Sequence, residues 1–189
     1  PAAPLRVSDS REGWCEALRV GMETWFAGAD ITFDTADLRP AGARLRTFGG
    51  KSSGPGPLQD LLAFTRKKIL KNQGGRLSNL DCHDILCKMG LIVVAGGVRR
   101  SAMISLSDLS DTELRDAKNG TFFHTHPHRM IANNSAVYRK KPSNTEFMEE
   151  WLALAKSGTG ERGIFNRGWL TATMPPRRLE YLRSNGDIH

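Results

Sequence analysis

The chain has 189 residues, of which 39% are hydrophobic and 25% are charged, a balance typical of a soluble globular domain. No apolar run approaches the roughly 20 residues needed to cross a bilayer, and the start of the chain lacks the pattern of a secretory signal. We therefore expect a cytoplasmic protein without membrane contact. The formal net charge of +7 favours an anionic partner, such as nucleotide phosphates, nucleic acid or an acidic protein surface. The three cysteines are too few for a disulfide framework and indicate a reducing compartment: Cys15, Cys82 and Cys87.

In the first third of the chain, the spacing of apolar residues predicts two helices, over residues 10–27 and 57–72. Between them, alternation over residues 31–34 predicts a strand, and the glycine-rich, basic residues 39–50 predict a loop. The second helix should turn five residues toward the core: Leu58, Leu61, Leu62, Thr65 and Ile69.

The middle of the chain is expected to alternate between helices and strands. A third helix is predicted over residues 79–89. Residues 91–95 (LIVVA) are short, β-branched and uniformly apolar, which is typical of a strand buried on both faces. A further strand over residues 102–106 and a short helix over residues 111–118 should follow.

Residues 122–142 are expected to be irregular, with a short strand around residues 136–138. Ser143 and Glu146 have the spacing of a capping box, so we expect an amphipathic helix that begins there and ends near Gly158. The last elements should be a strand over residues 163–166 and a helix over residues 176–185. Helices that alternate with strands predict an α/β fold.

Alternating histidines raise the question of a metal site. On an extended strand His124, His126 and His128 would share one face and could bind zinc or nickel. Pro127 interrupts the run, and no Cys, Asp or Glu stands beside it, so we interpret the segment as a solvated loop. We also expect no metal at a second group with ligand-like spacing, because its members diverge in direction on a helix: Cys82, His83 and Cys87.

A glycine pair followed by two arginines is the most distinctive local pattern. Gly96 and Gly97 free the backbone to approach a ligand, and Arg99 and Arg100 supply guanidinium forks suited to phosphates or base edges. The spacing matches neither a Walker A loop nor a dinucleotide-binding loop. From the residues alone, a tight turn with two solvated arginines remains an equal alternative.

Residues 93–102 (VVAGGVRRSA) are similar to the specificity loop of ribonucleotide reductases, especially the adenosylcobalamin-dependent class II enzymes. Five further segments resemble this family in order and spacing, so the resemblance spans essentially the whole chain. They are residues 7–14 (VSDSREGW), 42–50 with 53–55, 80–85 (LDCHDI), 132–138 (ANNSAVY) and 160–167 (GERGIFNR).

The resemblance implies that residues 1–189 form one segment of the family's ten-stranded α/β barrel, the half that carries effector binding and specificity. It implies a segment or split subunit of an enzyme that reduces ribonucleoside triphosphates to 2'-deoxyribonucleoside triphosphates for DNA replication. The complete enzyme would use a radical generated with adenosylcobalamin, whose metal is cobalt, and a thioredoxin-type reductant. The chain would then need the complementary reductase segment as its partner.

The resemblance also implies roles for individual residues. Asp9 would accept a hydrogen bond from the sugar of a deoxynucleoside triphosphate (dNTP) effector, Arg39 would pair with its phosphates, and Leu45 would line the pocket. From the residues alone, Asp9 is also a candidate helix N-cap and Arg39 an exposed loop charge. The loop that senses the effector and touches the ribonucleotide substrate, with Arg99 reaching the substrate, would comprise Gly96, Gly97, Val98, Arg99, Arg100 and Ser101.

The family's reacting groups are missing from the sequence. The chain has no Asn-Pro-Cys-Gly-Glu radical loop, no matching redox cysteine pair and no serine-rich phosphate loop. We therefore expect no catalytic residue in the chain and no activity from it alone. Two alternatives are a non-catalytic nucleotide-binding regulatory module and a basic nucleic-acid-binding domain. The second rests on the net charge and on three arginines near the end, Arg177, Arg178 and Arg183, without a recognisable nucleic-acid-binding motif.

Overall fold

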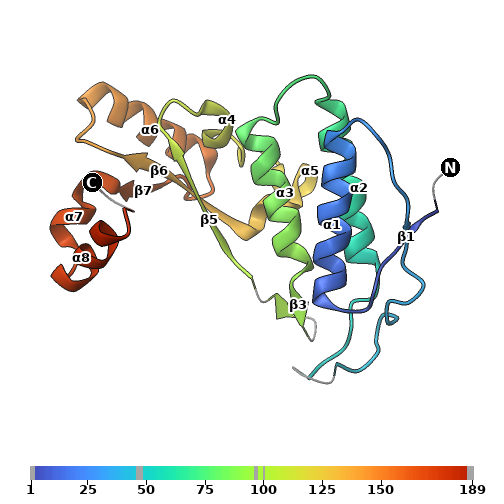
Figure 1. The fold of residues 1–189 in the computed structure, drawn as a ribbon. Helices are drawn as coiled ribbons and strands as arrows, with labels where there is room; N and C mark the ends of the chain where they lie inside the picture. The colour runs from blue at the N-terminus through green and yellow to red at the C-terminus, as the bar shows by residue number, and fades with distance from the viewer. Residues whose placement is uncertain (1–2, 46–48, 96–97, 100, 187–189) are drawn as a thin grey trace. The chain divides into compact units, whose positions relative to one another are not determined.

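The computed structural model describes residues 3–45, 49–95, 98–99 and 101–186, and of residues 94, 95, 98 and 99 it describes the backbone (Figure 1). The chain forms two compact units. The first comprises Pro1–Met103 and His126–Ala132, and the second comprises Ile104–Thr125 and Asn133–His189. Gly96, Gly97 and Arg100 of the predicted loop lie outside the described residues.

Three helices that lie side by side form the body of the first unit (Figure 1). Two short strand pairs accompany them: β1 runs parallel to β2, and β3 runs antiparallel to β4. A 3-10 helix, η1, completes the unit and packs against α3. The elements are β1 (Leu5–Arg6), α1 (Arg11–Phe26), β2 (Phe33–Asp34), α2 (Gly56–Lys71), α3 (Asn79–Ile92), β3 (Val94–Ala95), β4 (Val98–Arg99) and η1 (Pro127–Ile131).

Local signals explain where these helices begin. The Ser10 hydroxyl accepts a hydrogen bond from the Gly13 backbone N–H at 2.9 Å, and Ser78 caps α3 in the same way through the N–H of Asp81. Proline in the first turn opens α2, where its missing N–H leaves no bond unmade. The predicted helices over residues 10–27 and 57–72 are confirmed within one residue at each end.

The main core of the first unit forms where α1 and α2 pack together. All five residues predicted for the inner face of α2 are buried, and Thr65 is among them. The ring of Trp25 meets that of Phe33 edge-on at 6.1 Å, which joins α1 to β2. The buried apolar residues of this core are Val7, Ala17, Leu18, Trp25, Leu38, Leu58, Leu61, Leu62 and Ile69.

The predicted strand over residues 91–95 is wrong in its first half. Helix α3 continues to Ile92, Val93 is 50% exposed, and only Val94 and Ala95 are extended. The reason is that neighbouring residues of one helix serve two apolar clusters: Ile92 packs against the main core, and Leu91 packs against a second cluster around Cys87. A helix end with core on two sides has the same uninterrupted apolar run as a buried strand.

The second unit is built on a three-stranded sheet in the order β5-β6-β7. Strands β6 and β7 are parallel, with Ala136 opposite Ile164, and α6 connects them as expected for a βαβ crossover. The elements are β5 (Met103–Asp108), α4 (Thr112–Arg115), α5 (Phe122–Thr125), β6 (Ala132–Tyr138), α6 (Asn144–Ser157), β7 (Gly163–Asn166), η2 (Arg167–Trp169), α7 (Leu170–Thr173) and α8 (Pro176–Ser184).

The capping box before α6 is confirmed. The Ser143 hydroxyl accepts from the Glu146 N–H at 3.2 Å, and the Glu146 carboxylate accepts from the Ser143 N–H at 2.8 Å. Gly158 ends the helix with φ of 65°, in the left-handed region that favours glycine. Strand β7 and helix α8 are also confirmed.

Residues 122–142 are more regular than predicted, because they contain α5, η1 and the seven-residue strand β6. The polar residues Asn133 and Asn134 hide the start of β6 from a hydropathy pattern. The Asn134 N–H donates to the Glu161 carboxylate at 3.0 Å, so this backbone donor is satisfied by a side chain. The fold is therefore mixed α/β, as predicted, and among the described residues no helix is long and apolar enough to cross a membrane.

The packing of α2 predicts the effect of a core substitution. Leu58 is fully buried, so Leu58→Ala should lower the free energy of unfolding by about 2–5 kcal/mol, through lost apolar contact and the cavity left behind. Leu86→Ala, at a 51% exposed position of α3, should change it by less than about 0.5 kcal/mol. Urea denaturation followed by circular dichroism measures both, and equal effects would contradict this description of the core.

Candidate functional site

The structure brings together two of the predicted effector residues, Asp9 and Arg39. The Arg39 Nε donates to the Asp9 carboxylate at 2.7 Å, although the two residues are 30 positions apart. Because β1 and β2 run parallel, the segments after them leave at the same end of the strand pair, and Asp9 and Arg39 lie on these segments. The side chains are 33% and 39% exposed, so the ion pair is open to a ligand from solvent.

The helix-cap interpretation of Asp9 is wrong, since Ser10 is the N-cap of α1 and uses its own hydroxyl. Asp9 instead lies one residue before this N-cap, and its carboxylate accepts a hydrogen bond from Arg39. The surrounding backbone is tight, because a Cβ at Gly13 would lie 2.4 Å from the Ser8 carbonyl oxygen. Glycine at position 13 therefore lets α1 begin directly against the segment that carries Asp9.

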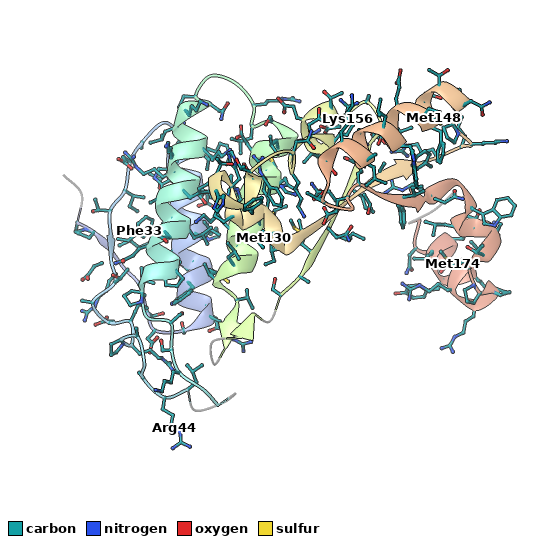
Figure 2. The ribbon with its side chains drawn as sticks, turned by 180° about the vertical axis from the view of Figure 1, so that it is seen from behind. Phe33, Arg44, Met130, Met148, Lys156 and Met174 are labelled. Atoms are coloured by element: carbon teal, nitrogen blue, oxygen red, sulfur yellow. The ribbon has the colours of Figure 1, made fainter. Side chains whose placement is uncertain are left out.

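Leu45 lies on the connection between β2 and α2, as Arg39 does. This connection folds back on itself: the Leu45 N–H donates to the Gly50 carbonyl at 2.9 Å, and Arg44 forms a β-bridge with Lys51. The Arg44 side chain points away from the helices of the first unit (Figure 2). Leu45 is partly buried in this turned loop, and none of the contacts that we observe in the described part of the chain joins it to Asp9 or Arg39.

Three residues of the predicted specificity loop belong to the described part of the chain: Val98, Arg99 and Ser101. Val98 and Arg99 form β4 and pair with β3 in a short antiparallel hairpin. Ser101 follows as a partly buried residue close to Gly90 of α3. The backbone of the hairpin therefore leaves α3 and returns beside the last turns of the same helix.

The main feature that sequence reasoning missed is a buried ion cluster centred on Asp84 of α3. The Asp84 side chain is 1% exposed. Arg129 of η1 donates two hydrogen bonds to its carboxylate, from Nε at 2.7 Å and from Nη2 at 2.9 Å. The Lys68 ammonium of α2 reaches the same carboxylate at 3.1 Å and Asp81 at 2.6 Å. One carboxylate thus joins α2, α3 and η1.

Two imidazoles complete the cluster. The His128 Nε2 lies 3.0 Å and the His83 Nδ1 lies 3.7 Å from the same Asp84 oxygen. The ring of Phe64 meets His128 edge-on at 5.1 Å. Burial by itself raises the pKa of Asp84, but the hydrogen bonds from Arg129 and Lys68, with the two imidazoles close by, outweigh it and hold this pKa well below its usual range. Asp84 is therefore a stable anion within a cationic shell.

The cluster corrects the interpretation of the histidine run as a solvated loop. His124 lies in α5 and His126 precedes η1, whereas His128 is only 4% exposed. The sequence did contain one signal: Asp84 stands between buried positions of α3, and a charge on an inner helix face requires a partner. Across the described residues, no three His, Cys, Asp or Glu side chains are arranged to hold a metal ion.

A second buried ion pair supports the second unit. The Arg162 guanidinium lies 3.1 Å from Glu150 and donates to the backbone carbonyls of Asp108 and Asp111 at 3.0 and 3.3 Å. Burial lowers the pKa of Arg162 from its ordinary value. Because Arg162 joins the end of β5 to α6, we interpret this pair as structural. The three arginines near the end of the chain are exposed on α8: Arg177, Arg178 and Arg183.

The described residues do not fit the binding of a corrin cofactor. Cys15 and Cys82 are exposed on different helices and Cys87 is buried against His83, so the three thiols do not form a reacting group. Two hollows, of about 360 Å³ between β1 and the start of α1 and of about 600 Å³ along α8, are open to solvent, and neither is lined by a His or Cys that could bind cobalt. We assign no step of the chemistry to this chain through the cofactor.

The charge of Asp84 predicts a pH effect on stability. Its pKa is lower in the folded chain than in the unfolded one, so the ionised carboxylate stabilises the fold above about pH 3.9, and this stabilisation is lost as the pH falls below that value. Asp84→Asn should lower the free energy of unfolding by about 3–5 kcal/mol at pH 7, because buried cations lose their counter-charge. It should also flatten the fall between pH 4 and 3.

Urea titrations at a series of pH values measure these changes. Asp60→Asn, on the exposed side of α2, is the matched control and should leave the stability and its pH dependence nearly unchanged. An Asp84→Asn variant as stable as the parent at pH 7 would show that the ion cluster contributes nothing.

Comparison with known proteins gives the chain its relatives. A family model described as "B12-dependent ribonucleotide reductase, insertion domain" matches residues 2–69. The adenosylcobalamin-dependent ribonucleoside-triphosphate reductase of Euglena gracilis is 37% identical over 144 residues, which cover 74% of this chain and 19% of that protein. The enzyme of the same name from Lactobacillus leichmannii is 37% identical over 167 residues, covering 85% of this chain and 22% of that protein.

A solved structure agrees with these relatives. The crystal structure of a B12-dependent, class II ribonucleotide reductase matches with a TM-score of 0.71 and 28% sequence identity, over 87% of this chain and 22% of that one. The chain is thus a partial homologue of the class II, B12-dependent ribonucleotide reductases, as the resemblance predicted. Within that class its homology is to the adenosylcobalamin-dependent ribonucleoside-triphosphate reductases, of which it spans about a fifth of the length.

The match over residues 2–69 includes α1, all but the last two residues of α2, and the Asp9–Arg39 pair. This family model describes an insertion domain, which is a separately named part of these reductases. The resemblance to the family implied that the whole chain belongs to the barrel and did not distinguish this part from the rest. The pair of predicted effector residues therefore lies on a segment that the family recognises as a unit.

Proposed function

We propose that this chain is the effector-binding and specificity segment of an adenosylcobalamin-dependent ribonucleoside-triphosphate reductase. The observation that carries the proposal is the contact between Asp9 and Arg39, which unites an acceptor for a sugar hydroxyl and a donor for phosphates at one partly exposed place. Homology to enzymes of that name supports the reaction.

The chemistry of the pair suits a nucleotide. A carboxylate can only accept hydrogen bonds, and the hydroxyls of a deoxyribose are donors that it can bind. The contact with Asp9 uses Nε of Arg39, which is one of five guanidinium N–H donors, so the two terminal amino groups could donate to phosphate oxygens. The formal net charge of +7 adds a general attraction for a triphosphate.

In this proposal Leu45 contributes an apolar wall for the effector, and the loop after α3 carries the signal to the ribonucleotide substrate. The loop comprises Gly96, Gly97, Val98, Arg99, Arg100 and Ser101, with Arg99 as the residue that reaches the substrate. In the complete enzyme this chain forms part of the ten-stranded barrel. The other segments contribute the reacting cysteines and the site for adenosylcobalamin, and a thioredoxin-type protein supplies the electrons. The complementary reductase segment is then the protein partner of this chain.

Calorimetric titration with the four dNTPs tests the effector site. The parent chain should bind at least one of them, and Asp9→Ala should weaken that binding about tenfold, because a hydrogen bond to a charged group is lost. Arg39→Gln should weaken it about ten- to hundredfold, through loss of the phosphate contact. Arg66→Gln removes a comparable exposed arginine, paired with Asp30, and should have no effect.

Inorganic tripolyphosphate separates the two roles. Asp9→Ala should not weaken its binding, since it has no sugar, whereas Arg39→Gln should weaken it as much as it weakens nucleotide binding. Absence of dNTP binding by the parent chain, or equal losses in Arg66→Gln, would overturn the assignment of the effector site.

Turnover distinguishes a reductase segment from a free-standing enzyme. With adenosylcobalamin, a dithiol and ribonucleoside triphosphates, the 189-residue chain should form no deoxynucleotide, because its sequence lacks the radical-loop motif. Chromatographic detection of products checks this. Formation of deoxynucleotide by the chain alone would show that one of its own cysteines reacts, and Cys15→Ser, Cys82→Ser and Cys87→Ser would then identify it.

A further inference from the structure

A small apolar cluster lies at the C-terminal end of α3, next to the point where the chain enters the β3–β4 hairpin. Its buried members are Cys87, Ile131 and Ala132, and the partly buried Leu91 and Met103 pack against it. Leu91 precedes the hairpin, and Met103 follows it. The two ends of the hairpin therefore meet at the same cluster, whose buried side is formed by Ile131 of η1 and the residue after it.

Gly90 shows how close these contacts are. A Cβ at this position would lie 2.7 Å from Cδ1 of Ile131 and 3.1 Å from the Ser101 hydroxyl oxygen. Position 90 therefore admits no side chain unless Ile131 moves. Gly90 precedes the hairpin and Ser101 follows it, and the two residues lie close together beside the Ile131 side chain.

The position of Ile131 is in turn set by the ion cluster. Arg129 stands two residues earlier in η1, and its two bonds to Asp84 at 2.7 and 2.9 Å fix both the distance and the orientation of η1 against α3. Asp84, Cys87 and Leu91 follow one another at helical spacing, so the ionic grip and the apolar contact lie on one face of α3.

We infer that Arg129 and Ile131 are positioning residues for the β3–β4 hairpin and Ser101. Arg129 fixes η1 on Asp84, and the Ile131 side chain then packs where the chain enters and leaves the hairpin, beside Gly90 and Ser101. The importance of this hold for substrate choice rests on the proposed function, in which this hairpin belongs to the specificity loop. The hold itself is a property of the 189-residue chain without any nucleotide.

Residue-resolved amide hydrogen exchange by NMR tests the inference. In Ile131→Ala the amides of β3 and β4 should exchange about tenfold faster, whereas those of the buried parts of α1 and α2 should keep their rates. Ile131→Leu, which retains the side-chain volume, should restore the slow exchange. Met130→Ala is the matched control: Met130, labelled in Figure 2, belongs to the same helix but is 56% exposed.

A double-mutant cycle shows whether Arg129 acts through Ile131. Arg129→Lys keeps the charge and loses the two-pronged grip, so it should also speed exchange in β3 and β4. Combined with Ile131→Ala it should add little, because the connection is already broken. Additive effects would mean that Arg129 does not act through Ile131.

Unchanged exchange in β3 and β4 of Ile131→Ala would overturn the inference, as would equal acceleration in α1 and α2, which would indicate a loss of general stability. The same acceleration in Met130→Ala would also count against it. No nucleotide is present in these measurements. A chain that binds no dNTP would therefore defeat the proposed function and leave the result on Ile131 intact.

Discussion

The buried carboxylate of Asp84 is the constraint on which the arrangement of the first unit depends. An ionised group without water must be surrounded by partners, and here they come from α2, from α3 itself and from η1. The segment His126–Ala132 is separated from α3 along the chain, yet it belongs to the same compact unit, and Asp84 gives the physical reason. Neutralisation of the Asp84 charge therefore joins η1 to α3, a role that a large apolar interface has in many other proteins.

The parts that the sequence predicts well depend on neighbours along the chain. The inner face of α2 and the capping box of Ser143 and Glu146 are examples, because helical spacing and capping are set within four residues. The run at residues 91–92 shows the limit of this reasoning. Leu91 and Ile92 are apolar for two different neighbours, and a one-dimensional pattern cannot distinguish that from a strand.

The candidate site likewise contains one contact whose residues could be found from the sequence and another that could not. The pairing of Asp9 with Arg39 joins residues 30 positions apart, and family resemblance, which reflects the folded protein, brought both residues to attention where spacing could not. The grip of Arg129 on Asp84 spans 45 positions and has no local sign except a charge on an inner helix face. Neither the burial of His128 nor its partner could be read from the alternating histidines around it.

The placement of Leu91 and Ile92 on two clusters limits how α3 can move. Successive residues of an α-helix are turned by about 100° from each other, so a rotation of α3 about its own axis would withdraw one of these side chains from its cluster while pressing the other into a filled core. A shift along the axis would lengthen the bonds that Asp84 makes with Lys68 of α2 and Arg129 of η1. Helix α3 is therefore held against rotation by its two apolar clusters and against an axial shift by the Asp84 ion cluster.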